Sequence, residues 1–207
     1  YQKTILDNGV RILTEELPHV RSAAIGIWVN VGARHEEKKI NGIAHFIEHM
    51  LFKGTKRRTA VDIAREMDSV GGILNAFTNR EYTCFYAKVL EKHIPMAVDL
   101  LSDIFLNSKF DPEELEKERK VVLQEISMVE DTPDDYVHDF FNEVVWPEDP
   151  LGRPILGTVE TINSLSREDM TGYIKERYIA GDVIISASGS VRHQEVVKLL
   201  SDNGFGT

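Results

Sequence analysis

The chain has 207 residues, one cysteine and a net charge of −10 from 34 acidic and 24 basic residues. This length fits one sizeable domain whose hydrophobic core is stable without cross-links. A single cysteine excludes an internal disulfide and favours a reducing compartment. The acidic excess argues against nucleic acid and anionic membranes as partners, and no apolar run approaches the roughly 18 residues of a membrane span.

Strands are predicted at the start of the chain. The runs 3–7 and 10–15 flank Asn8-Gly9, a strong signal for a two-residue hairpin turn. A third run, 22–31, is apolar nearly throughout, as expected for a central strand of a sheet that lies under helices. The sequence therefore indicates an antiparallel beginning.

A short helix over 41–53 carries the most informative motif. His45 and His49 are four residues apart, so a helix places them one turn apart on the same face, where two imidazoles can bind one metal ion. Glu48 lies on the adjoining side of that face, where a base acting on a water nucleophile would stand. The spacing H-x-x-E-H is typical of zinc-dependent hydrolases. Apolar residues cover most of the remaining circumference, which predicts a buried helix: Ile43, Phe46, Ile47, Met50, Leu51 and Phe52.

The next segments read as a basic turn, a helix and two strands. The residues 53–58 are interpreted as a solvated turn that leads into a helix over 59–70 with Thr59 as its cap. Strands are expected at 73–78 and 82–90. Cys84 falls in the second of these strands and is interpreted as inert packing.

A second acidic helix can supply the third ligand that a hydrolytic zinc site requires. Asp111 is a natural N-cap and Pro112 fits the first helical position of a helix that runs to about residue 130. Glu118 and Glu125 are seven residues apart on one face, beside apolar residues, where a carboxylate is costly unless it is paired or bound to metal. Both glutamates are therefore candidates for the third metal ligand.

The remaining elements complete an α+β fold, an antiparallel or mixed sheet of five or six strands with helices packed on one face. Proline and glycine predict an irregular loop from Pro147 to Gly157, and the histidines outside the motif are interpreted as surface residues rather than ligands. The other predicted elements are helices at 93–107, 133–145, 166–178 and 192–200 and a strand at 183–189. The whole chain, 1–207, is expected to form a single zinc-binding domain.

Several stretches together resemble one family. They are Gly42 to Thr55, Asn75 to Glu81, Glu118 to Val122 and Pro150 to Pro154. The sequence resembles the N-terminal catalytic half of the pitrilysin (insulysin) family of zinc peptidases, peptidase family M16, which includes processing peptidases of mitochondria. The resemblance implies that His45, His49 and Glu125 bind Zn²⁺, that Glu48 is the catalytic base, and that Glu118 supports activity without binding the metal.

The resemblance also implies partners. The stretch Asn75-Ala76-Phe77 is similar to an edge strand along which family members bind a peptide substrate as an added strand. A second, similarly folded domain or subunit is expected to close over the substrate, and a homodimer is a further option. On this view the chain corresponds to the first half of a longer enzyme, located in the cytoplasm or alternatively in the mitochondrial matrix.

These observations predict a zinc metalloendopeptidase that hydrolyses peptides or unfolded polypeptides. One alternative is a non-catalytic assembly or partner subunit of the same fold, which the presence of all four metal-site residues disfavours. Another is an unrelated hydrolase acting on small molecules, which the strand-like Asn75 stretch disfavours.

Overall fold

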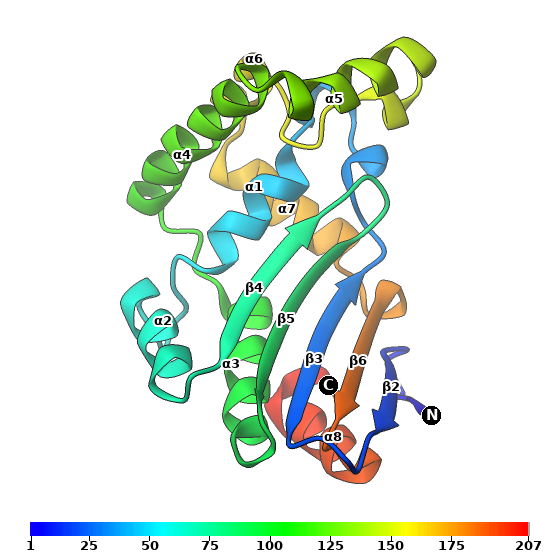
Figure 1. Cartoon of the computed structure of the whole chain (residues 1–207). Coiled ribbons are helices and arrows are strands. Elements are labelled where there is room, and N and C mark those ends of the chain that lie inside the picture. The colour runs from blue at the N-terminus through cyan, green and yellow to red at the C-terminus, as the bar shows by residue number, and fades with distance from the viewer. Residues whose placement is uncertain (207) are drawn as a thin grey trace.

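The computed structural model describes residues 1–206 and contains one six-stranded mixed sheet (Figure 1). Its spatial order is β1-β2-β6-β3-β5-β4. The strands are β1 Gln2–Ile5, β2 Arg11–Glu16, β3 Ser22–Val29, β4 Ile73–Thr78, β5 Thr83–Leu90 and β6 Val183–Gly189. All neighbours are antiparallel except β2 and β6, which pair in parallel and bring the two ends of the chain together.

Helices cover one face of this sheet, and its other face is open in Figure 1. The helices are α1 Ile43–Leu51, α2 Ala60–Ser69, α3 Ile94–Asn107, α4 Pro112–Glu130, α5 Pro133–Val145, α6 Val159–Ser164, α7 Arg167–Arg177 and α8 His193–Leu200. The α+β architecture with helices on one face is thus confirmed. Within residues 1–206, no helix has the length and apolar character that crossing a bilayer requires.

The core lies between the sheet and its helices. In β3, Ile25, Ile27 and Val29 are fully buried because alternate side chains of a strand point to the helix-covered face. Phe46 and Ile47 of α1 are fully buried as well, which confirms that the short helix is a core element. The metal motif is therefore mounted on a rigid part of the molecule.

The first hairpin differs from the expectation of a two-residue turn. β1 ends at Ile5 and β2 begins at Arg11, so the connection is longer than Asn8-Gly9 alone. Gly9 adopts a φ of 98°, a left-handed conformation that glycine tolerates without steric cost, and its amide donates to the carbonyl of Leu6. The sequence located the turn correctly, but the connection between the strands is longer than predicted.

Two basic residues after α1, Arg57 and Arg58, form an ionic network with carboxylates of α3 and α2. Arg58 donates to Asp99, Asp103 and Glu66, at 2.5, 2.8 and 2.9 Å. The Asp103 side chain is completely buried, whereas that of the neighbouring Arg57, which also contacts Asp99 and Asp103, is 54% exposed. The predicted solvated turn is therefore wrong for Arg58, because burial of Asp103 requires a cation beside it.

Replacement of Arg58 by methionine is expected to lower the free energy of unfolding by about 2 kcal/mol, because it removes a charged partner from a buried carboxylate. Arg57→Met is the matched control and should cost less than about 1 kcal/mol, since its ion pairs are half exposed. Urea denaturation of both variants measures the difference. Equal losses for the two arginines would contradict this view of the network.

Candidate metal centre

Two imidazoles meet on one face of α1. The Nε2 atoms of His45 and His49 lie 3.2 Å apart, with the ring centroids 4.6 Å apart. Both side chains are largely buried, at 12% and 18% exposure. The i, i+4 spacing on a short helix is the direct cause of this convergence.

A carboxylate from α4 completes a triangle of donor atoms. Glu125 Oε2 lies 3.6 Å from His45 Nε2 and 3.4 Å from His49 Nε2. Tetrahedral bonds of the lengths typical for zinc, roughly 2.0–2.2 Å, separate neighbouring ligand atoms by roughly 3.3–3.6 Å. The three donors therefore stand at the spacing that one zinc ion requires, without rearrangement of the chain.

The protonation states also fit a cation. Burial lowers the pKa of His45 to about 3, with a further contribution from His49, so its ring is neutral at neutral pH. The Nδ1 of His49 lies 3.1 Å from Glu118 Oε2, so it carries the proton that it donates to the carboxylate. That tautomer leaves the Nε2 lone pair of His49 free for a metal. The Nδ1 of His45 is buried without a hydrogen-bond partner in the described chain.

Glu118 stands behind the donor triangle rather than in it. It is 6% exposed, and it contacts His49 through Oε2 while Lys53 Nζ lies 2.6 Å from its Oε1. Sequence reasoning placed Lys53 in a solvated patch and missed this contact. The available signal was its position four residues after His49, one helical turn further along the same line.

Glu48 points from α1 toward β4. Its Oε2 accepts a hydrogen bond of 2.5 Å from the Thr78 hydroxyl at the end of that strand. Burial raises the pKa of Glu48 above its ordinary value, although the Thr78 hydrogen bond opposes this shift. A raised pKa in a partly buried carboxylate suits a group that exchanges protons near neutral pH. Cys84 lies in β5 nearby, and burial raises its pKa to about 12, consistent with a packing role.

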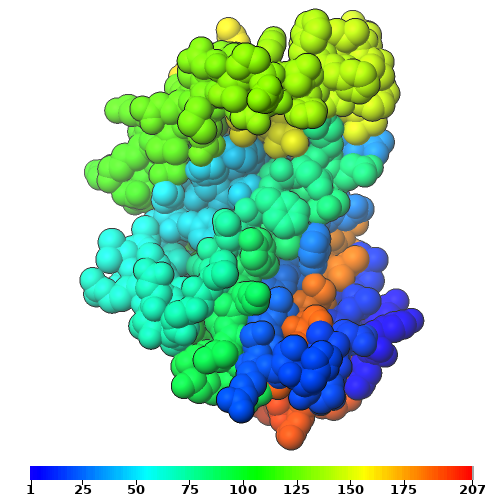
Figure 2. Space-filling view, in the orientation of Figure 1, coloured from blue at the N-terminus to red at the C-terminus, as the bar shows by residue number. Residues whose placement is uncertain are grey.

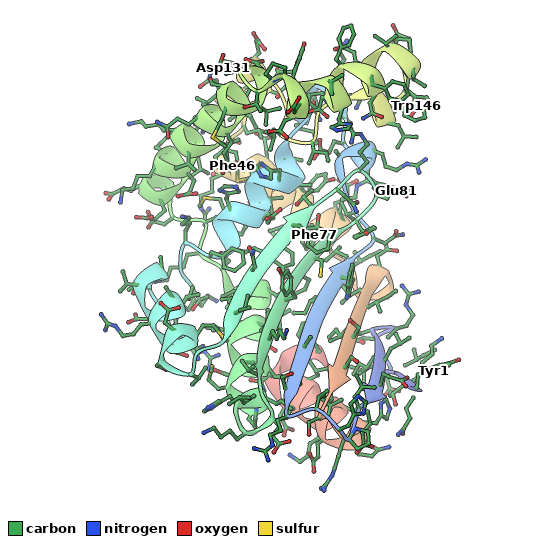
Figure 3. All side chains as sticks on the ribbon, viewed as in Figure 1. Tyr1, Phe46, Phe77, Glu81, Asp131 and Trp146 are labelled. Atoms are coloured by element: carbon green, nitrogen blue, oxygen red, sulfur yellow. The ribbon has the colours of Figure 1, made fainter. Side chains whose placement is uncertain are left out.

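β4 is an edge strand, as the family resemblance implied, and pairs with β5 alone. Asn75 and Phe77 are on its exposed face, and the amide of Ala76 donates to Asn75 Oδ1 at 2.8 Å. Figure 3 labels Phe77 on this strand. Its ring packs against those of Trp28 and Tyr86, with centroids 5.9 and 6.3 Å away.

The donor triangle, Glu48 and the edge strand lie close together. In Figure 2, residues of α1 remain visible between α4 and β4, so this part of the molecule opens toward one surface. A cavity of about 490 Å³ lies elsewhere, between α4, α5 and the segment 147–161. None of the three donor residues lines this cavity, although Ile126, which follows Glu125, does.

The other histidines are not part of the centre. His35 accepts a hydrogen bond from the Gly32 amide at 3.1 Å, a local structural role, and His138 is exposed. The interpretation of His193 as a surface residue was wrong. It is 6% exposed and bonds to the hydroxyls of Thr4 and Thr14, at 2.7 and 2.9 Å, where it joins α8 to the first hairpin.

A match to a family model decides the classification. Residues 11–159 match the model described as "Insulinase (Peptidase family M16)". The chain belongs to the M16 family. This confirms the resemblance to pitrilysin-type peptidases on which the ligand assignments were based.

Relatives within the M16 family carry peptidase names. "Uncharacterized zinc protease YmxG" of Bacillus subtilis (strain 168) is 50% identical over 184 residues, covering 89% of this chain and 45% of the relative. A protein of Arabidopsis thaliana, "Probable mitochondrial-processing peptidase subunit beta, mitochondrial", is 44% identical over 195 residues, covering 94% of this chain and 37% of the relative. The chain thus spans about half or less of the length of these M16 relatives.

A solved protease structure has closely the same fold. The crystal structure of a protease from Helicobacter pylori superposes with a TM-score of 0.94 at 23% identity and covers 99% of this chain and 50% of that one. At this identity the likeness concerns the fold alone. Together, the family match and the names of the relatives support a peptidase-type function.

Proposed function

We propose that this chain is the metal-binding domain of a zinc-dependent endopeptidase that hydrolyses peptides or unfolded polypeptides. The observation that carries the proposal is the triangle of donor atoms from His45, His49 and Glu125, with sides of 3.2, 3.4 and 3.6 Å. All three atoms are of the kinds that zinc selects, two imidazole nitrogens and one carboxylate oxygen. In this proposal, residues 1–207 form a single domain that holds the ion.

The residues of the chain have distinct roles in the proposed reaction. When bound, Zn²⁺ would supply Lewis-acid polarisation of the substrate carbonyl and acidify the attacking water. Glu48 takes a proton from that water at its carboxylate and later returns it to the departing amine. Glu118 keeps the Nδ1 of His49 protonated and the ring in orientation, with Lys53 balancing its charge.

The substrate is proposed to bind as an added strand along β4. The main chain at Asn75, Ala76 and Phe77 would pair with an extended peptide, which suits unfolded substrates because main-chain hydrogen bonds are indifferent to side-chain sequence. Asn75 would release the amide of Ala76 when the peptide binds. A peptide on this edge passes the Thr78 end of the strand, where Glu48 is bonded.

A second, similarly folded domain or subunit is part of the proposal, because the chain spans about half the length of its relatives. That half would enclose the substrate and complete the stabilisation of the oxyanion. A cytoplasmic or mitochondrial-matrix location, in which the free thiol of Cys84 stays reduced, fits the same proposal.

Zinc content and peptide cleavage, measured with and without a chelator, test the proposal on the full-length protein that carries this chain. One zinc per chain and cleavage that the chelator stops and added zinc restores are expected. Stoichiometric zinc without cleavage would favour the non-catalytic assembly subunit. Absence of zinc from freshly purified and zinc-supplemented protein would refute the metal site itself.

A further inference from the structure

The helix that carries both imidazoles cannot cap its own beginning. Its N-cap residue, Gly42, has a φ of 94° and no side chain to bond the free amides of the first turn. A Cβ at this position would lie 2.6 Å from the Leu156 carbonyl oxygen and 2.8 Å from Gly157 Cα. Close packing against the 156–157 loop therefore requires glycine here, and the first turn needs a cap from elsewhere.

Glu36, six residues before the N-cap, supplies that cap. Its Oε2 accepts from the Gly42 amide at 2.7 Å, and its Oε1 accepts from the Ala44 amide at 2.9 Å. The residue is only 3% exposed. A negative charge at this end of the helix also interacts favourably with the helix dipole.

Two further hydrogen bonds hold Glu36, one to its carboxylate and one to its backbone carbonyl. Asn41 Nδ2 donates to its Oε2 at 2.8 Å and also approaches the Pro154 carbonyl at 3.1 Å. Arg153 donates to the Glu36 backbone carbonyl at 2.6 Å. Burial raises the pKa of Glu36 to about 7. The hydrogen bonds from the two backbone amides and from Asn41, and the positive charge of Arg153, oppose this shift. An ionisable group is thus kept in the interior at an energetic cost, which an apolar residue would avoid.

Glu36 caps the turn of α1 that carries His45, one of the residues of the candidate metal centre. The amide of Ala44 immediately precedes His45, so His45 is in the first turn, the part of a helix that frays when its amides have no partner. α1 has nine residues, too few to be stable by itself. We infer that Glu36 is a positioning residue for the metal centre, whose carboxylate fixes the first turn of α1 and so holds the His45 ring where it binds zinc. This inference rests on the proposed zinc site.

Glu36→Gln is the direct test, because it keeps the size of the side chain but places an amide donor against an amide donor of the first turn. Zinc affinity, measured by competition with a chelator on the full-length protein at pH 7.5, should fall about 10- to 100-fold, as for other groups that orient ligands. At zinc concentrations well above both dissociation constants, peptide cleavage should return to nearly the wild-type rate. Ser166→Ala is the matched control. It removes the hydroxyl that caps α7 by accepting from the Asp169 amide, and it should leave zinc affinity unchanged.

The outcomes separate this inference from the proposed function. Wild-type protein without zinc binding would refute the proposed function. Zinc binding by wild type and by a folded Glu36→Gln variant within twofold of each other would overturn the inference alone. If Glu36→Gln shows no cooperative thermal transition, Glu36→Asp decides, since it retains the charge and shortens its reach. An affinity equal to wild type for that variant would also overturn the inference, and weaker binding would support it.

Discussion

Replacement of Glu48 by glutamine is expected to abolish peptide cleavage while leaving the zinc content unchanged. Loss of a general base typically costs 10²- to 10⁴-fold in rate. Glutamine has nearly the same shape and can still accept the hydrogen bond from Thr78, so the surroundings of residue 48 should persist. Glu48 is not part of the donor triangle, so metal binding does not depend on it. Cleavage rates and metal analysis of the same preparation measure both effects.

Glu195→Gln provides the control for the Glu48 variant. Glu195 is exposed on α8 and pairs with Arg192, away from the centre, so the same chemical change there should leave both quantities unaltered. Loss of zinc from Glu48→Gln would instead make Glu48 a ligand. Retention of full activity would assign the proton transfer to another group.

Replacement of Glu125 by alanine is expected to have the largest effect on metal binding. It removes the only carboxylate of the donor triangle and leaves two imidazoles from α1, too few for a stable zinc site. The zinc affinity should fall by more than the roughly 10- to 100-fold typical of a supporting residue. Isothermal titration with zinc measures the loss, and peptide cleavage should disappear with the metal.

Glu118→Gln, on the same helix, is the matched variant for Glu125. Its side chain contacts a ring nitrogen that faces away from the triangle, so a reduction in zinc affinity within the supporting range is expected. If Glu118→Gln lost zinc completely and Glu125→Ala retained it, the assignments of ligand and supporting residue would have to be exchanged.

Local signals in the sequence predicted most of the elements. α5 begins and ends where expected, at Pro133 and Val145, because proline marks its first turn and apolar periodicity continues to its end. α1 was expected over 41–53 but occupies Ile43–Leu51, since the positive φ of Gly42 is incompatible with a helix. α6 was missed because its six residues lie beside a stretch rich in proline and glycine.

Non-local features could not be predicted in the same way. The parallel pairing of β2 with β6 joins segments about as far apart as the chain allows, and nothing in either strand specifies its partner. The motif and the family resemblance identified His45, His49 and Glu125, and the structure brings these three together. Lys53 and Glu36 escaped notice because their importance depends on what tertiary packing places beside them.

The unpaired edge of β4 has a consequence for handling the protein. A strand edge with exposed apolar side chains, here Ile73 and Phe77, is a template on which other extended chains can accumulate. The side chain of Asn75 already occupies one main-chain donor of this edge, which weakens such pairing. The exposed edge nevertheless remains the place where we expect crowded or partly unfolded copies to aggregate first, and a short peptide bound along it should keep concentrated solutions clear.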